Sequence, residues 1–308
     1  MSKPKTLAYL CEKIEKLGFD YLVESSDHLV IPETINSTYP YSEDGKYPQF
    51  KENLEQLTTL SFIAAASNKI GLLSSIMVIS YRPLLLTTKI LSTIDYLSEG
   101  RLTVGVGVEW LKEEFDILGI PYEERGHLAD EYLQALRELW LNPVASFNGK
   151  FCNFSRVSLV PRPVQDPHPP IWVGGESIWA MKRAARYGDG WLPIGANPSH
   201  LLDSLERMND AVKRFHSYVY EFGRHPEEFE IGYIMPEYNL TPDSQERKGL
   251  FTGPAAKLIN TIRVPEDWGD VYRFQTSSGN SRRNLGSFRE ILVCRITEHS
   301  SDSVRPKG

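Results

Sequence analysis

Apolar residues alternate between helical and strand-like spacing along most of the chain. Residues 7–17 repeat leucine and isoleucine at the spacing of one helix face, and residues 20–24 follow as a short apolar strand. The pattern then predicts helices at 54–66, 84–97, 128–140, 178–186 and 201–222, and strands at 69–79, 101–107, 171–174, 191–194 and 230–235. Strands that alternate with helices indicate a parallel sheet covered by helices.

Two architectures satisfy this order of elements, a (β/α)8 barrel and an open doubly wound sheet. A chain of 308 residues suits the barrel, which takes about 250 residues or more. The Gly-x-Gly-x-x-Gly turn of a nicotinamide dehydrogenase with an open sheet is absent near the start. The sequence therefore predicts an α/β, (β/α)8 TIM-type barrel as a single domain over residues 1–278. Within it, residues 32–51 form a polar, aromatic insertion after the first strand.

Composition narrows the function classes. With 41% hydrophobic residues, 24% charged residues and a net charge of −6, the chain has the profile of a globular protein without the basic excess that nucleic-acid binding needs. No apolar run approaches the ~20 residues of a membrane span, and no secretion signal is visible. The three cysteines are odd in number and far apart, which argues against a disulfide framework or a metal site. We expect a cytoplasmic protein that acts on a small molecule.

The segment PPIWVGGESIWAMKRAARYGDGW, residues 169–191, carries the most specific chemical signal. An apolar strand ends at Gly174 and Gly175, and a helix follows near Ser177. Glycines allow a sharp turn that exposes backbone N–H groups, and the helix start adds the positive end of its dipole. This arrangement suits a phosphate, with a plain strand-to-helix turn as the alternative.

Three long segments resemble the luciferase-like monooxygenase superfamily. They are SSDHLVIP after the first strand, LSEGRLTVGVGVEWLKEEFDILGIPYEERG in the middle, and PVQDPHPPIWVGGES followed by RAARYGDGW. The resemblance spans residues 6–251 and is strongest to the branch that uses the deazaflavin coenzyme F(420). It implies a (β/α)8 barrel, a homodimer, and an oxidoreductase that transfers a hydride between the cofactor and a small organic substrate. The alternative cofactor is FMN, which implies a monooxygenase that uses oxygen and depends on a partner reductase.

The resemblance gives roles to residues at the first two strands. Asp27 and His28 follow the first strand, at the end where barrel enzymes place their chemistry. His28 becomes the catalytic proton donor or acceptor, and Asp27 a cofactor contact, with a turn or helix cap as its alternative. The resemblance also places a non-proline cis peptide at Ser75–Ile76 against one face of the flavin ring, where the residues alone indicate an ordinary buried strand.

Further roles follow for the later strands and for the insertion. Gly105 and Gly107 let the chain approach the cofactor. Trp110 either walls the active site or packs on a helix at 112–117. The resemblance assigns the cofactor phosphate to Gly174, Gly175, Glu176 and Ser177. From the insertion itself, we expect three tyrosines to line the substrate entrance, with a plain surface loop as the alternative: Tyr39, Tyr41 and Tyr47.

The chain also departs from the family pattern. Residues 1–5 contain no strand ahead of the first helix, which predicts a barrel open at one edge. After a helix at 254–262 and a strand at 271–274, residues 279–308 form an atypical polar segment. Glu109 and Glu176 replace residues that are commonly glycine or small, and we expect both to point to solvent. These departures leave a non-catalytic barrel that binds a flavin, or nothing, as an alternative function.

Overall fold

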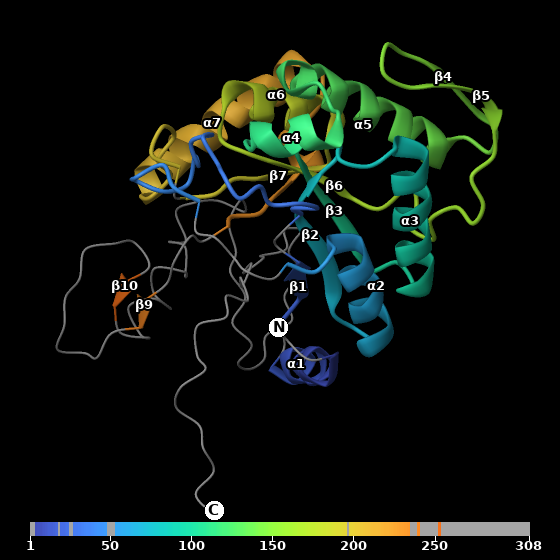
Figure 1. The fold of residues 1–308 in the computed structure, drawn as a ribbon, viewed down its shortest axis with the longest axis horizontal. Coiled ribbons are helices and arrows are strands. Elements are labelled where there is room, and N and C mark those ends of the chain that lie inside the picture. The colour runs from blue at the N-terminus through green and yellow to red at the C-terminus, as the bar shows by residue number, and fades with distance from the viewer. Residues whose placement is uncertain are drawn as a thin grey trace, which may run out of the picture.

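The described part of the chain forms a curled parallel sheet with helices outside it. The structure is a computed structural model that describes residues 4–17, 19–24, 27–47, 53–195, 197–234, 239–240 and 252–253. Within these residues the main sheet has the strand order β1-β2-β3-β6-β7-β8 (Figure 1). The strands are β1 Tyr21–Glu24, β2 Gly71–Val78, β3 Leu102–Gly107, β6 Ile171–Gly174, β7 Gly190–Leu192 and β8 Glu230–Ile231.

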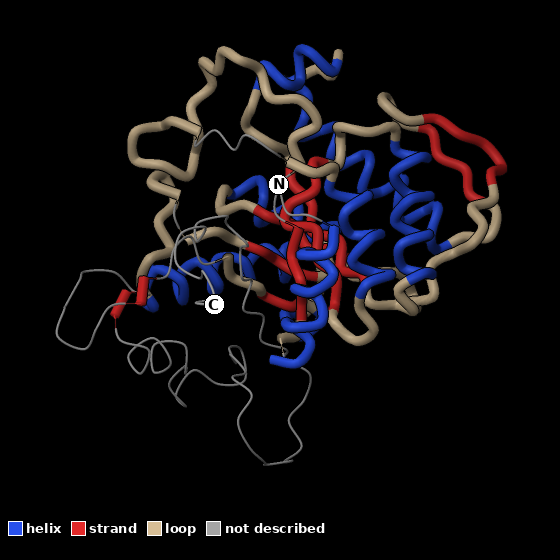
Figure 2. The backbone as a smooth tube through the Cα atoms, turned by 60° about the horizontal axis from the view of Figure 1, so that its bottom comes forward, coloured by secondary structure: helices blue, strands red, loops and turns tan. Residues whose placement is uncertain are grey.

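All pairs of neighbouring strands in this sheet run parallel. The helices that connect and cover them are α1 Pro4–Leu17, α2 Gln56–Ala66, α3 Leu84–Leu97, α4 Lys112–Leu118, α5 Arg125–Leu141, α6 Ile178–Tyr187 and α7 Leu205–Glu221, with short 3-10 turns η1 Tyr122–Glu124 and η2 Pro226–Glu228. Figure 2 shows helices gathered beside the curved sheet. The described residues therefore form an incomplete (β/α) barrel.

The predicted elements agree with this architecture, and the differences are local. A two-stranded antiparallel hairpin, β4 Ala145–Asn148 and β5 Asn153–Val157, was not predicted, and it projects beyond α5 in Figure 1. Two short strands, β9 Asn239–Leu240 and β10 Thr252–Gly253, pair in parallel. The predicted helix at 254–262, strand at 271–274 and polar segment at 279–308 lie outside the described residues.

An open edge is expected, and within the described part of the chain the sheet has one at β1. The first described element is the helix α1, which begins at Pro4. Among the described strands, β1 pairs with β2 alone, so it forms one edge of the sheet.

A register shift in β2 changes which of its residues face the helices. The pairing of β2 with β3 is irregular between Ser74 and Met77, and the predicted non-proline cis peptide Ser75–Ile76 lies within this stretch. An extra residue in a strand reverses which side chains face each side. Leu72 before the shift, and Met77 and Ile79 after it, therefore all pack in the core under the helices.

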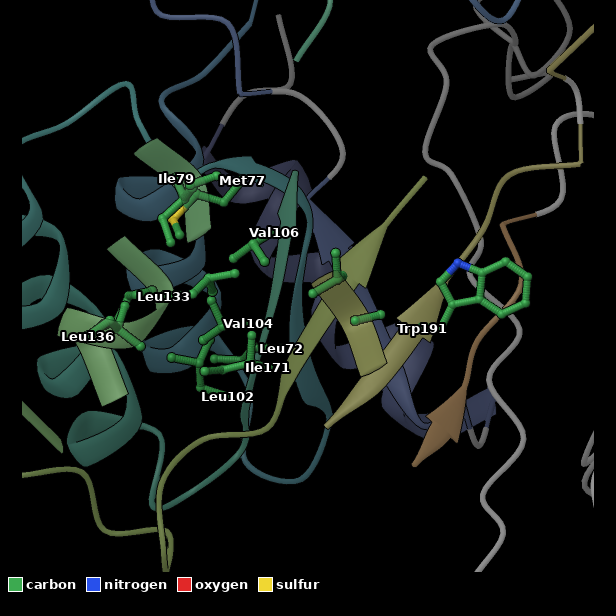
Figure 3. Packing of buried hydrophobic residues seen from close by; sticks show 14 of the residues in the cluster. Leu72, Met77, Ile79, Leu102, Val104, Val106, Leu133, Leu136, Ile171 and Trp191 are labelled. Carbon is green, nitrogen blue, oxygen red and sulfur yellow. The ribbon is translucent and has the colours of Figure 1, made fainter. Parts of the chain in front are cut away.

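The main core fills the space between the sheet and the helices. Figure 3 shows Leu133 and Leu136 of α5 beside strand residues that include Leu102 and Val104. Further along the same core, Trp191 of β7 stacks on Phe215 of α7. Alternate residues of β3 face this core, as expected for strands whose side chains point to opposite faces in turn.

On the inner side of the sheet, Ile76 packs against a second core cluster, and glycines on the adjoining strands make room for it. A Cβ atom on Gly174 would lie 1.7 Å from Ile76 Cδ1, and one on Gly107 would lie 2.9 Å from Ile76 Cγ2. A Cβ atom on Gly105 would lie 2.0 Å from the Ser74 carbonyl oxygen. We expected glycine at these positions to make room for a ligand. The structure shows that the close approach of β2 also requires glycine there.

Replacing Gly105 by alanine tests this packing. The new methyl group would meet strand backbone, which cannot move aside, so we expect a loss of about 1–3 kcal/mol or more in the free energy of unfolding. Urea unfolding measures it. The matched control is Gly126→Ala in α5, where the nearest atom is Arg183 Nη2 at 3.4 Å; this helical substitution should cost nothing. Equal stability of the two variants would contradict the packing argument.

Candidate active site

The candidate site lies where β1, β2 and β3 end and their connecting loops begin. Residues 27–47 follow β1, and in Figure 1 this blue segment runs beside the green helix α4. The carboxyl ends of parallel barrel strands form the face on which such enzymes place their active sites.

Asp27 joins the loop after β1 to the end of β2. Its Oδ2 accepts hydrogen bonds from Val78 N at 2.7 Å and Arg82 Nη1 at 3.0 Å, and its Oδ1 lies 2.5 Å from Arg82 Nη2. Arg82 also pairs with Glu55, the N-cap residue of α2. Burial raises the pKa of Asp27, and the Arg82 guanidinium opposes the rise only in part. Asp27 therefore links two loops of the site, which is more than the local turn or helix cap given as the alternative to a cofactor contact.

Glu114 is the buried centre of the site. Its Oε1 accepts hydrogen bonds from Leu29 N at 2.7 Å and Val30 N at 3.0 Å, while its Oε2 lies 2.7 Å from His28 Nδ1 and 3.0 Å from Tyr81 Oη. The Glu114 side chain is fully buried, yet its two oxygens have four partners, which compensates for desolvation of the charge. One carboxylate in α4 thus fixes both the loop after β1 and the ring of His28.

The neighbouring residue Glu113 holds the next part of the same loop. It accepts hydrogen bonds from Asn36 N, Ser37 N and Ser37 Oγ at 2.6–3.0 Å. Burial opposes ionisation, but these hydrogen bonds lower the pKa of Glu113 to about 2. Sequence reasoning missed both glutamates. The signal was present as two adjacent acids in the first turn of a helix, the position that the helix dipole favours for carboxylates.

His28 is held in a way that favours its charged form. Its side chain is 8% exposed. Burial acts to lower the pKa of His28, but the Glu114 hydrogen bond and the nearby charges of Glu109 and Glu114 outweigh it and raise the pKa above its ordinary value. Glu114 therefore positions the ring and favours its charged form, as a proton donor requires.

The three tyrosines of the insertion gather with Trp110 beside His28. Tyr39 lies at the centre, with ring centroids 5.6 Å from Tyr41, 5.2 Å from Tyr47 and 5.1 Å from Trp110. Tyr47 is 5.0 Å from the His28 ring and 5.4 Å from Trp110. We call Tyr39, Tyr41, Tyr47 and Trp110 the aromatic cluster; each of its side chains is half-buried. The described part of the insertion, residues 32–47, therefore packs against the site, and its role in lining the substrate entrance stays a prediction.

Glu109 and Glu176 do not point to solvent, which corrects the sequence prediction. One oxygen of Glu109, Oε1, is buried and has no hydrogen-bond partner within the described structure. Glu176 is 4% exposed, and it accepts hydrogen bonds from Ile194 N at 2.6 Å and Asn197 Nδ2 at 2.9 Å. Burial raises the pKa of both carboxyl groups. The general preference of unpaired glutamates for the surface fails here because both positions lie where strands end inside the barrel.

The predicted phosphate turn has the expected backbone. Gly175 has a φ of +106°, and Ser177 is the N-cap of α6, where its Oγ accepts a hydrogen bond from Ala180 N at 3.2 Å. The Gly175 carbonyl accepts a hydrogen bond from Trp191 Nε1 at 2.8 Å. Asp189 joins the start of β6 to β7, since it accepts a hydrogen bond from Ile171 N at 2.9 Å. The turn is a helix start whose backbone N–H groups suit an anion.

The luciferase-like monooxygenase family profile matches residues 2–264. The chain belongs to the luciferase-like monooxygenase family. An uncharacterized protein of Mycobacterium tuberculosis is 29% identical over 93% of this chain and 94% of its own length. The FMNH(2)-dependent dimethylsulfone monooxygenase of Pseudomonas putida is 31% identical over 60% of this chain. The matched part covers 47% of that relative's own length.

A solved structure of the same fold is the coenzyme F(420)-dependent tetrahydromethanopterin reductase of Methanopyrus kandleri. It superposes with a TM-score of 0.59 at 21% identity over 80% of this chain and 66% of that one. This likeness, with the family match, shows the TIM-barrel fold of the luciferase-like chain. Within its described residues no helix is long and apolar enough to cross a membrane, and no group of three or more metal-ligating side chains is found there.

Replacing Glu114 by alanine tests its role as the centre of this luciferase-like site. The change leaves Leu29 N, Val30 N and Tyr81 Oη without their buried acceptor, so we expect the free energy of unfolding to fall by about 3 kcal/mol or more. Limited proteolysis should also cleave residues 27–47 faster. Glu123→Ala, which removes an exposed glutamate just after α4, is the control. A loss no greater than that of the control would contradict the assigned role.

Proposed function

We propose that this luciferase-like protein is a flavin-type oxidoreductase that transfers a hydride between coenzyme F(420) and a small organic substrate. The observation that carries the proposal is the hydrogen bond between His28 and Glu114 at the carboxyl end of the barrel strands. The family and its relatives that use F(420) or reduced FMN support an oxidoreductase. FMN is the alternative cofactor, and it would make the protein a monooxygenase supplied by a partner reductase.

The phosphate turn supports an anionic cofactor. Gly175 has a positive φ of +106° just before α6, and Ser177 is the N-cap residue of that helix. The nearby Glu176 carboxyl is held by Ile194 and Asn197, and its raised pKa reduces the negative charge that would repel a phosphate. Gly174, Gly175, Glu176 and Ser177 would hold the phosphate through backbone N–H groups, and Ser75, Ile76, Gly105 and Gly107 would lie against the ring.

The chain's own residues would manage the proton. A bound deazaflavin would supply the ring carbon that gives or takes the hydride, and a flavin would supply a ring nitrogen at the same place. His28 would hold the proton that accompanies it, because Glu114 orients the imidazole through Nδ1 and leaves the other ring nitrogen for the substrate. The aromatic cluster would exclude water from the reacting atoms. The homodimer and the cytoplasmic location implied by the resemblance stay predictions.

Replacing His28 by asparagine tests the proton step. We expect turnover to fall about 10²–10⁴-fold, with the cofactor Kd nearly unchanged. In the direction of substrate reduction, the wild-type rate should fall as pH rises through the raised pKa of His28, above the ordinary value of about 6.5. Glu114→Gln should move that fall to lower pH because it removes the partner that raises the pKa. An unchanged rate in His28→Asn, or an unchanged pH profile in Glu114→Gln, removes His28 from the mechanism.

Fluorescence titration of the purified protein with coenzyme F(420) and with FMN tests the cofactor. We expect saturable binding of the deazaflavin, followed by hydride exchange with a suitable reductant. Tighter binding of FMN favours the monooxygenase alternative. Binding of neither cofactor excludes the proposed enzyme and favours a non-catalytic barrel.

A further inference from the structure

Tyr81 follows β2 and carries a buried hydroxyl that the proposed proton step does not use. The residue is 5% exposed, and its ring packs edge-on against Phe115 of α4 with 5.2 Å between the ring centroids. Its Oη donates a hydrogen bond to Glu114 Oε2 at 3.0 Å. A buried tyrosine hydroxyl needs a partner, but a backbone carbonyl is sufficient, as Trp110 O is for Tyr122 Oη at 3.1 Å. Packing alone therefore does not require a carboxylate as the acceptor.

The oxygen that Tyr81 uses is the one that also holds His28. Glu114 Oε2 lies 2.7 Å from His28 Nδ1, so a single oxygen lies between the phenol and the imidazole. The other oxygen, Oε1, accepts from Leu29 N and Val30 N. A hydrogen bond donated to a carboxylate stabilises its ionised form and lowers its affinity for a proton. The Tyr81 hydroxyl therefore weakens the bond that the same oxygen makes to the His28 ring.

The loop after β2 fixes the Tyr81 hydroxyl in this position. The backbone N–H of Tyr81 donates to the last carbonyl of β2 at 3.1 Å, and the next residue, Arg82, binds Asp27 through two nitrogens. Asp27 and His28 are adjacent in the chain, as are Tyr81 and Arg82. The two loops are thus joined twice, directly through Arg82 and indirectly through Glu114. The hydroxyl is therefore held against Glu114 in both protonation states of His28.

The acidic groups around His28 act in the opposite direction from this hydroxyl. Glu114, Glu109 and Asp27 all favour the protonated ring, although Arg82 partly neutralises Asp27. The titratable and charged residues that face His28 or its partner Glu114 come from the loops after β1 and β2, the end of β3 and the helix α4: Asp27, Tyr47, Tyr81, Arg82, Glu109 and Glu114. The acids among them hold the proton on the ring, and a donor that opposes them eases its release.

We propose that Tyr81 is a positioning residue that limits how strongly Glu114 binds the protonated His28 ring. The proposal rests on the proposed function, since it refines the proton step of the same site. A proton donor works best when its affinity for the proton suits the working pH. Glu114 alone would hold the imidazolium by charge and by hydrogen bond. Tyr81 draws on the same oxygen, so His28 releases its proton to a substrate more readily.

A pH titration of the cofactor-free protein, followed by the NMR signal of the His28 imidazole, tests this role. The signal is identified by its absence in His28→Asn. Tyr81→Phe keeps the ring and removes the hydroxyl, so we expect the acid dissociation constant of His28 to fall about three- to tenfold. Replacing Tyr81 by 3-fluorotyrosine makes the hydroxyl a stronger donor, and the same constant should rise. Each variant decides by itself, because a constant that is unchanged or moves in the other direction overturns the proposal.

Tyr122→Phe is the matched control. Tyr122 also packs edge-on against Phe115, with 5.3 Å between the ring centroids, but its hydroxyl donates to the Trp110 carbonyl. This variant should leave the His28 constant at its wild-type value, and a shift as large as that in Tyr81→Phe would assign the effect to packing and overturn the proposal.

Turnover separates failure of this proposal from failure of the proposed function. Expected titration shifts in a protein that turns over with neither coenzyme F(420) nor FMN refute the oxidoreductase and support the role of Tyr81 beside His28. Turnover with an unshifted titration refutes the role of Tyr81 and leaves the proposed function in place. In an active enzyme, Tyr81→Phe should move the fall in rate to higher pH, opposite to Glu114→Gln.

Discussion

The candidate site depends on one buried carboxylate. Glu114 is fully buried and still satisfies both oxygens, with two backbone N–H groups, one tyrosine hydroxyl and one imidazole as partners. An unpaired charge at this depth would be very costly, so moving any of these four groups away from Glu114 would cost free energy. The loop after β1, the end of β2 and the start of α4 are therefore fixed relative to each other. Glu113 extends the same attachment one residue further along the loop.

The inside of the barrel obeys a second constraint, which is space. At the register shift in β2, the Ile76 side chain lies on the inner side of the sheet and packs against Gly107 and Gly174. A larger residue on either strand would collide with that side chain. The glycines that resemble cofactor-binding motifs are thus also required by packing, and a motif match alone could not separate the two reasons.

The carboxyl groups of the site are stabilised in different ways. Asp27 is neutralised by Arg82, and Glu114 is satisfied by hydrogen bonds, whereas Glu109 has a buried oxygen without a described partner. Glu176 is buried but held by Ile194 and Asn197. These carboxyl groups differ in how they are stabilised because their local hydrogen-bond donors differ, not because of residue type.

The sequence by itself determined the order of elements, the family and the position of the strand ends. These follow from apolar periodicity and from long motifs, which are local properties of the chain. It also indicated His28 and the three tyrosines of the insertion as site residues. Only the tertiary structure decided the partners. His28 meets Glu114, which is 86 positions away, and no local pattern encodes that distance. The directions of Glu109 and Glu176 were wrongly predicted for the same reason, since burial is set by how distant strands close around a position.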